Sequence, residues 1–257
     1  MEYGIVQASY IPVRKDPDST SEMTSQLLFG EIFEVLDRNE QWQLVRNRFD
    51  GYEGWISPEM TSRFTDDALG EYEAMESVLV KERFCSLRAP EGTLLVPAGS
   101  VLYYHAGDPR HILCGKTYEL DRVPGKPAKD KGKALGDLKG ELLNIPYLWG
   151  GKSSYGTDCS GLVQTICRIL DVPLLRDASQ QVGQGKTVNM MTESGTGDLV
   201  FFDDEEGEIV HTGIITGPGE ILHASGCVKT DAIDHQGIYS MQLGKYTHRL
   251  RVIKRVI

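Results

Sequence analysis

The chain of 257 residues is long enough for two or three domains, and its net charge of -10 argues against nucleic-acid binding, which needs a basic surface. No segment approaches the ~18 consecutive apolar residues of a membrane span. The five cysteines lie far apart and include no C-x-x-C pair, so neither a disulfide framework nor a structural zinc site is expected. Because residues 1–20 lack the apolar core of a signal peptide, we expect a cytoplasmic protein, exported if a leader has been removed.

Residues 1–60 are predicted to form a small β-barrel. Alternating apolar side chains mark strands within 26–36, 42–46 and 49–56, and turn residues separate them. The stretch 51–56 reads Gly-Tyr-Glu-Gly-Trp-Ile. With this layout, the region resembles a bacterial SH3 domain.

The next part of the chain is predicted to hold a linker and a second barrel. Residues 61–75 are polar and are interpreted as the linker. Apolar strand patterns return at 77–80, 93–100 and 101–105. We therefore interpret residues 76–124 as a second, divergent SH3-like domain.

Residues 125–257 are predicted to form the third domain. It begins in the Pro-Gly-Lys-Pro loop at 124–127, and a helix is predicted over 128–143. Further along, the chain reads Pro-Tyr-Leu-Trp-Gly-Gly at 146–151 and Gly-Thr-Asp-Cys-Ser-Gly at 156–161. These glycine-rich runs place one cysteine where a loop gives way to a helix.

Cys159 is predicted to lie in the first turn of a helix that Asp158 caps. Apolar side chains recur after it at the spacing of one helix face, and Cys167 on that face takes a core position. Unpaired N–H groups and the positive end of the helix dipole stabilise both a thiolate and a developing oxyanion. A lone cysteine is more often inert core, but here the core role is already filled, and we interpret Cys159 as a nucleophile.

Two predicted strands, 208–216 and 220–225, are joined by a Gly-Pro-Gly turn and carry His211 and His223. A two-residue turn without a bulge would place the two imidazoles on opposite faces of the sheet. A three-residue loop would instead pair His223 with Gly213 and make the imidazoles diagonal neighbours, with backbones roughly 7–8 Å apart. We expect this second register, because it supplies the cysteine with a base and a group that orients it.

Four motifs in this order resemble the NlpC/P60 cysteine peptidases, which have an α+β papain-like fold and cut peptidoglycan stem peptides. The motifs are Tyr-x-Trp-Gly-Gly at 147–151, Asp-Cys-Ser-Gly-Leu-Val at 158–163, His-Thr-Gly-Ile at 211–214 and Ile-Leu-His-Ala-Ser at 221–225. The resemblance implies that Cys159 is the nucleophile, His211 the general base and His223 the polar third member. It also implies that Tyr147 lines the pocket and helps to polarise the scissile carbonyl.

The resemblance further suggests residues that bind substrate. Arg-Asp-x-Ser-Gln at 176–180 resembles a segment with which family members bind a free peptide amino end, although a helix N-cap is the alternative for Asp177 and Ser179. In the first domain Glu31 and Tyr52 are candidates to complete the amine pocket, with core or surface roles as the alternative. The remaining candidates for substrate binding are Trp149, Asp158 and Ser160.

We therefore predict a γ-D-glutamyl-L-diamino acid endopeptidase with two SH3-like domains ahead of the catalytic domain. Its substrates would be L-Ala-γ-D-Glu-diamino acid stem peptides with a free amino end, as in muropeptide recycling. His211 is expected to keep Cys159 as a thiolate, and the N–H of Cys159 with Tyr147 to hold the oxyanion. Neither a cofactor nor a nucleic-acid or membrane partner is expected.

Three alternatives remain at this stage. One is a non-catalytic wall-binding protein, which would leave the set of Cys159, His211 and His223 unexplained. Another is a related thiol amidase or acyltransferase that acts on a different amide or ester. The last is a zinc site made from the same cysteine and histidines, which elemental analysis of the purified protein would reveal.

Overall fold

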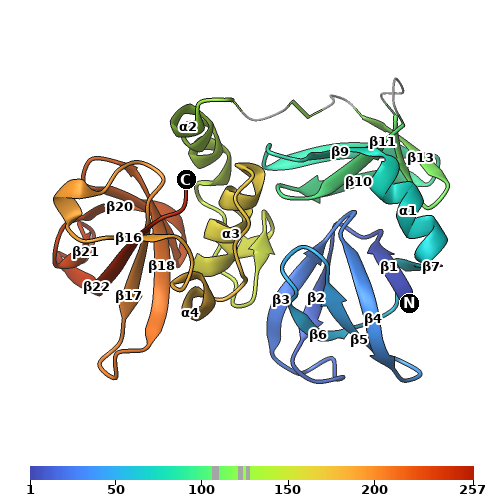
Figure 1. The fold of residues 1–257 in the computed structure, drawn as a ribbon, viewed down its shortest axis with the longest axis horizontal. Helices are drawn as coiled ribbons and strands as arrows, with labels where there is room; N and C mark the ends of the chain where they lie inside the picture. Colours follow the sequence, from blue (N-terminus) through green and yellow to red (C-terminus); the bar gives the residue numbers. More distant parts are fainter. Residues whose placement is uncertain (106–109, 121–123, 126–127) are drawn as a thin grey trace. The chain divides into compact units, whose positions relative to one another are not determined.

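The computed structural model describes residues 1–105, 110–120, 124–125 and 128–257. The chain forms two compact units, Met1–Lys126 and Pro127–Ile257, drawn from blue to green and from green to red in Figure 1. Across the described part of the chain, no helix has the length and apolarity needed to cross a membrane.

The first unit begins with a seven-stranded antiparallel sheet in the order β3-β2-β6-β5-β4-β1-β7. Its core contains Val6, Leu27, Phe33 and Ile56, all fully or almost fully buried. The predicted strand region 26–36 is split by a tight turn at Gly30, whose φ of 77° favours glycine. The strands are β1 (Glu2–Val6), β2 (Tyr10–Arg14), β3 (Met23–Leu28), β4 (Ile32–Arg38), β5 (Gln43–Asn47), β6 (Glu53–Ile56) and β7 (Thr61–Thr65).

The predicted linker at 61–75 is wrong. Strand β7 pairs with β1 from Glu2↔Thr65 to Val6↔Thr61, and helix α1 (Asp66–Ala74) follows directly. Phe64 explains why this polar segment forms regular structure. Its ring stacks on Tyr3 with centroids 6.2 Å apart and lies 5.4 Å from the ring of Tyr72. A single aromatic side chain thus anchors a strand whose other residues are polar because they lie at a sheet edge.

The rest of the first unit forms a four-stranded sheet, β10-β9-β13-β12, and a two-stranded sheet, β11-β8. Their core, which includes Leu87 and Leu102, also takes in Ile5 from the first sheet and Phe29 from the turn after β3. The two parts therefore share one core, and a second SH3-like barrel in this region stays a prediction. The strands are β8 (Glu76–Leu79), β9 (Phe84–Ala89), β10 (Gly92–Pro97), β11 (Val101–Tyr104), β12 (His111–Leu113) and β13 (Lys116–Leu120).

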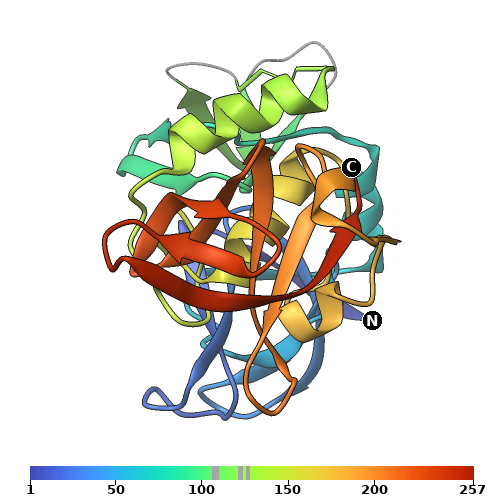
Figure 2. The ribbon, with the colours of Figure 1, turned by 90° about the vertical axis from the view of Figure 1, so that its left-hand side faces the viewer.

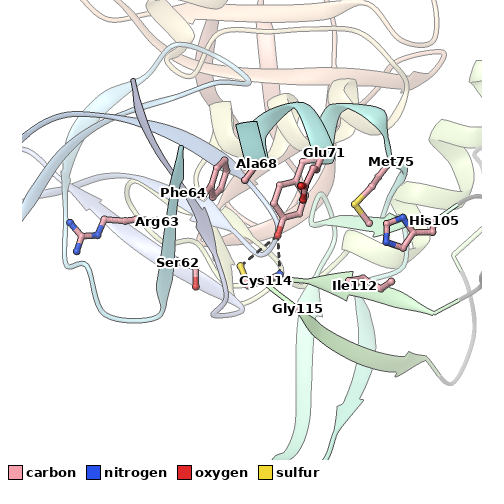
Figure 3. A pocket seen from close by; sticks show the side chains of 11 residues that line it. Ser62, Arg63, Phe64, Ala68, Glu71, Met75, His105, Ile112, Cys114 and Gly115 are labelled. Atoms are coloured by element: carbon pink, nitrogen blue, oxygen red, sulfur yellow. Dashed lines mark hydrogen bonds between the residues drawn. The ribbon is translucent and has the colours of Figure 1, made fainter. Parts of the chain in front are cut away.

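A cavity of about 530 Å³ lies in the first unit between β7, α1 and the turn after β12 (Figure 3). Phe64, Met75 and Ile112 give it apolar walls. The Tyr72 hydroxyl at its edge accepts a hydrogen bond from the backbone N–H of Cys114 at 2.9 Å. The Tyr72 hydroxyl is therefore already engaged within the protein.

In the second unit, strands β17 to β22 close into a barrel, because β22 pairs with both β17 and β21. Val200, Ile215, Ile221 and Ile238 belong to one buried cluster, which fills the barrel interior. Helix α3 packs outside against β18 and β19, as Figures 1 and 2 show. The strands are β14 (Lys152–Ser153), β15 (Gly156–Thr157), β16 (Lys186–Val188), β17 (Leu199–Asp203), β18 (Ile209–Gly217), β19 (Glu220–Ser225), β20 (Cys227–Ile233), β21 (Gly237–Ser240) and β22 (Lys245–Arg255).

The helices of the second unit begin and end close to the predicted positions. The predicted helix 128–143 is observed as α2 (Lys131–Leu142), where the Asp130 carboxylate caps the first turn by accepting from the N–H of Lys133. The remaining helices are α3 (Cys159–Ile169), α4 (Ala178–Gln181) and the 3₁₀ turn η1 (Met191–Glu193). Because both faces of β17 are buried, the sheet is covered on its outside as well as its inside.

Candidate active site

Cys159 is the first residue of α3, as predicted. The Asp158 carboxylate caps this helix by accepting from the N–H of Gly161 at 2.7 Å. The Cys159 thiol is buried, and backbone N–H groups of Ser160 and Thr212 donate to it. The contact with Thr212 places β18 against the thiol, and Thr212 follows His211 directly in the sequence. Cys167, further along α3, is completely buried and takes the predicted core position.

A buried ion pair supports the start of this helix. Arg176, only 1% exposed, donates from both of its terminal nitrogens to the two Asp158 oxygens, at 3.0 and 2.7 Å. The same carboxylate accepts from the Gly150 N–H and the Ser160 hydroxyl. Losing either charge would leave the other buried and unpaired, which is strongly destabilising. Because the Gly150 N–H bonds to the same carboxylate, the pair also holds the glycine-rich loop against the start of the helix. This bonding accounts for the burial of Asp158 and Ser160, whose contact with substrate stays a prediction.

The two strand histidines meet on one face of the sheet. Gly213 pairs with His223, which is the predicted register. The route differs from the predicted three-residue loop, because a two-residue Pro-Gly turn is combined with a bulge between Ile215 and Gly217. A side chain at Gly213 would collide with Ile221 and with the backbone of β19, so this position requires a glycine.

A hydrogen-bonded chain links the histidines to a carboxylate that the sequence analysis missed. Nε2 of His211 lies 2.9 Å from Nδ1 of His223, and Nε2 of His223 lies 3.0 Å from a carboxylate oxygen of Asp231. Since a carboxylate can only accept, Nε2 of His223 carries the proton and its Nδ1 must accept. His211 therefore donates from Nε2, and the lone pair of its neutral ring lies on Nδ1. This hydrogen-bonded chain from Asp231 through His223 to His211 is called the relay below. It leaves the lone pair of His211 on Nδ1, and a general base needs such a lone pair.

Burial shifts the pKa of the nucleophile and the pKa of the base, each in the direction that favours the uncharged form. Burial, followed by the neighbouring Asp158 charge, raises the pKa of the Cys159 thiol to about 11. Burial and the nearby His248, His223 and Lys229 hold the pKa of His211 well below its usual value of 6.5. That His211 keeps Cys159 as a thiolate stays a prediction.

Tyr147 and Trp149 lie on the loop that precedes α3. Tyr147 is 36% exposed, and partial burial of its phenol together with the nearby Cys159 and Asp158 raises the pKa of that phenol to about 12. It is therefore a neutral O–H donor near the thiol at ordinary pH. Within the described part of the chain, no acceptor is bonded to the N–H of Cys159, which leaves a second donor for an oxyanion. Trp149 is 62% exposed, so it is available to a bound peptide.

Asp177 takes the N-cap position of the short helix α4, the alternative role given for it. Its N–H donates to the Gln180 side chain at 3.2 Å, and the two residues form a reciprocal capping box. Asp177 is half-buried, whereas Ser179 is exposed. Binding of a substrate amine by these two residues stays a prediction.

Glu31 and Tyr52 belong to the first unit and have structural partners there. The Glu31 side chain is 1% exposed, and its carboxylate accepts from the N–H of Leu28 across the turn between β3 and β4. Tyr52 is half-buried against the core of the first sheet. These contacts give both residues a role inside the unit, and their part in substrate binding stays a prediction.

Two residues beside the relay were not expected from the sequence. Asp231 lies on β20, where His223 pairs with Lys229, so Asp231 shares their face two residues further along. The short turn at Gly226 between β19 and β20 could have revealed it. His248 on β22 stacks on His211, with ring centroids 4.1 Å apart.

A zinc site built from the same residues has no geometric support. Among the residues that the structure describes, no group of three or more His, Cys, Asp and Glu side chains is arranged to hold a metal ion. His211 and His223 instead direct one nitrogen each at the other across 2.9 Å, a hydrogen-bonding distance that leaves no room for an ion between them.

Comparisons with known proteins agree with this geometry. The NlpC/P60 family model matches residues 144–248, and the model of the bacterial dipeptidyl-peptidase SH3 domain matches 13–59. A γ-D-glutamyl-L-lysine dipeptidyl-peptidase of Bacillus subtilis is 38% identical over 78% of this chain and 71% of its own. A protein of the same name from Bacillus cereus is 25% identical over 80% of this chain and 68% of its own.

Solved structures confirm the fold. An NlpC/P60 family protein from Bacillus cereus matches 99% of both chains with a TM-score of 0.83 and 19% identity. An NlpC/P60 endopeptidase from Photobacterium damselae subsp. piscicida matches 99% of this chain and 71% of its own, with a TM-score of 0.72 and 17% identity. With a 38% identical relative covered over most of its length, the chain belongs to the NlpC/P60 family of cysteine peptidases and carries an N-terminal bacterial SH3 domain.

Proposed function

We propose that this cysteine peptidase cleaves the γ-D-glutamyl-L-diamino acid bond of peptidoglycan-derived peptides that have a free N-terminal L-Ala. The observation that carries the proposal is the relay from Asp231 through His223 to His211, beside a thiol at the start of α3. This arrangement supplies a nucleophile, a base with a defined tautomer and two donors for an oxyanion.

The substrate class is supported by the relatives. Two proteins similar over more than two thirds of their length are named γ-D-glutamyl-L-lysine dipeptidyl-peptidases. A dipeptidyl-peptidase releases two residues from a free amino end, so an L-Ala-γ-D-Glu dipeptide is the expected first product. The identity of the diamino acid is left to the experiment below.

In the first chemical step, Nδ1 of His211 takes the thiol proton as Sγ of Cys159 attacks the γ-amide carbonyl carbon. The imidazolium that forms is stabilised because His223 accepts from Nε2 of His211 and is itself held by Asp231. Negative charge on the carbonyl oxygen is met by the N–H of Cys159 and the phenol of Tyr147. Both donors are present before substrate binds, so they need little reorganisation.

In the second step, His211 gives its proton to the nitrogen of the diamino acid, which leaves as an amine. The γ-glutamyl thioester on Cys159 remains. Water attacks this thioester with His211 again as the base, and the free thiol and a γ-carboxylate are regenerated.

A free amino end would be selected by a carboxylate beside the nucleophile. Asp158 is surrounded by internal donors, which leaves Asp177 as the carboxylate best suited to an ammonium group. An acetyl cap removes that charge and adds bulk. We expect N-acetylated peptides to be cut at least about a hundredfold more slowly, since each 1.4 kcal/mol of lost binding is a factor of about ten.

The test is mass spectrometry of products from a panel of L-Ala-γ-D-Glu-diamino acid peptides, free and N-acetylated, with Lys or diaminopimelate as the diamino acid. Release of L-Ala-γ-D-Glu from free peptides, absent in Cys159→Ala and kept in Cys167→Ala, supports the proposal. Equal rates on capped and free peptides, or cleavage at a different bond, would refute it.

A further inference from the structure

His248 lies in the barrel against the catalytic base. Its ring stacks on that of His211, with centroids 4.1 Å apart and planes inclined by 24°. It comes from β22, which closes the barrel by pairing with β17 on one side and β21 on the other. The chemical steps above do not use this ring, so its position calls for another explanation.

The hydrogen bond to His223 alone does not orient His211. It restrains one point of the His211 ring, Nε2, and leaves the ring free to rotate about the hydrogen-bond axis. The His223 ring is nearly perpendicular, at 87°, and presents an edge rather than a face. The Phe202 ring is tilted by 44° with its centroid 5.7 Å away. Among the residues that the structure describes, only the stacked ring of His248 lies nearly parallel to the plane of the base.

Rotation of His211 matters because Nδ1 must point at the thiol. A tilt of the ring moves the Nδ1 lone pair away from the proton that it takes, and a misplacement of about 1 Å can slow a reaction about a hundredfold. A flat ring packed on the imidazole face opposes that tilt, and stacked aromatic contacts are favourable in themselves. His248 is in turn held by a 2.9 Å hydrogen bond between its Nδ1 and the Thr247 hydroxyl.

The stacked ring must also be uncharged when the base takes a proton. The charged or titratable groups that face His248 are His211 on β18, His223 on β19 and Lys229 and Asp231 on β20. Burial, then Lys229, lowers the pKa of His248, while Asp231 acts in the opposite direction. A neutral imidazole therefore lies against His211 when the imidazolium forms, and repulsion between two stacked cations is avoided.

We propose that His248 is a positioning residue that holds the ring plane of His211 and so directs its Nδ1 lone pair at the thiol of Cys159. A flat, uncharged aromatic ring is what the position requires. Phenylalanine should therefore replace His248 with little loss, whereas alanine removes the restraint and lysine adds a charge to the base. The proposal rests on the proposed function for its peptide assay but not for its alkylation assay.

The experiment compares His248→Ala, His248→Phe and His248→Lys with wild type, and uses His235→Ala as the matched control because His235 is an exposed histidine of the same unit. Thermal melts establish that each variant is folded. The kcat and KM are measured on the free L-Ala-γ-D-Glu-Lys peptide over a range of pH. Alkylation of Cys159 by iodoacetamide, followed by mass spectrometry, reports proton removal without any peptide.

We expect His248→Ala to lower kcat and the alkylation rate at least about tenfold, with KM within about twofold, and His248→Phe to stay within about threefold of wild type. His248→Lys should be slower than His248→Ala, because a cation beside His211 opposes its protonation, and for the same reason the acid limb of its pH profile should move to lower pH than in wild type. Unchanged rates in His248→Ala, an effect on KM alone, or equal losses in the alanine and phenylalanine variants would overturn the proposal. If the peptide is not cut by wild type, the proposed function fails while the alkylation rates still decide the role of His248.

Discussion

Two buried histidines, one in each unit, show what separates a core residue from a base. His111 in the first unit is fully buried, and burial lowers the pKa of its ring to about 4. His211 in the second unit is also buried, with its pKa lowered by the same cause. Aromatic rings flank both, since the Phe29 centroid is 5.3 Å from that of His111 and the Phe202 centroid 5.7 Å from that of His211. Burial and a low pKa therefore do not identify a catalytic histidine.

The difference lies in where the lone pair points. Nδ1 of His111 lies 2.9 Å from the backbone nitrogen of Tyr103 and 3.1 Å from its carbonyl oxygen, and the buried Nε2 has no partner among the described residues, so in either tautomer the lone pair stays inside the core. In His211 the relay holds Nε2 as the donor and leaves the lone pair on Nδ1, which in the proposed mechanism takes the thiol proton. The position of the lone pair, which Asp231 sets through His223, is therefore what makes His211 suitable as a base.

The largest effect should come from replacing His211 with alanine, and the same change at His111 serves as its comparison. His211→Ala removes the base, and we expect turnover of the free peptide to fall at least about a thousandfold while the fold is kept. His111→Ala should leave kcat per folded molecule unchanged. Steady-state kinetics with active-site titration measures kcat per folded molecule in both variants. Comparable losses of kcat in the two variants would contradict the distinction between a core histidine and a base.

Removing the charge at the end of the relay should have the next largest effect. In Asp231→Asn the amide can donate to His223 and so allow the wrong tautomer, and we expect kcat to fall about a hundredfold with little change in KM. Asp234→Asn is a suitable control, because Asp234 bonds to Tyr246 and not to the relay. A wild-type kcat in Asp231→Asn would show that the carboxylate does not set the tautomer.

How much of this site the sequence predicts depends on how local its contacts are. The pairing of His223 with Gly213 follows from a short turn and the two-residue period of a strand, and it was predicted correctly even though a bulge replaces the longer loop. Asp231 lies one hairpin further and was within reach of the same reasoning. His248 was not, because barrel closure and a register shift in β21–β22 place it beside His211.

The same limit applies to the first unit. The linker prediction for 61–75 rested on polar composition, which cannot show that Phe64 anchors an edge strand to β1. The shared core that brings Ile5 and Phe29 together with Leu87 is equally non-local. Patterns along the chain predict elements well, whereas contacts between distant elements need the structure.

The third prediction concerns stability. His111→Ala leaves a cavity in the aromatic core of the first unit, and we expect the free energy of unfolding of that unit to fall by about 2–4 kcal/mol. Urea unfolding followed by circular dichroism measures the change. His235→Ala, at an exposed position, should be neutral; a neutral His111→Ala would mean that the ring contributes no packing.

A smaller effect should appear in the pH dependence of stability. The pKa of His111 is about 4 in the folded protein against 6.5 for an ordinary imidazole, so the unfolded chain binds more protons between these values. Its contribution is therefore present in full above pH 6.5 and is lost as the pH falls toward 4. At pH 5 the loss is about 2 kcal/mol. His111→Phe should show a correspondingly weaker decline between pH 7 and pH 5, and an identical decline would exclude His111 as its source.

The most direct test of the account is nitrogen-15 NMR of the His211 ring in the free protein at pH 7, assigned by comparison with His211→Ala. The account predicts a neutral ring with the proton on Nε2 and a bare Nδ1, beside an uncharged Cys159 thiol. A ring protonated on both nitrogens at pH 7, or a neutral ring with its proton on Nδ1, would contradict it.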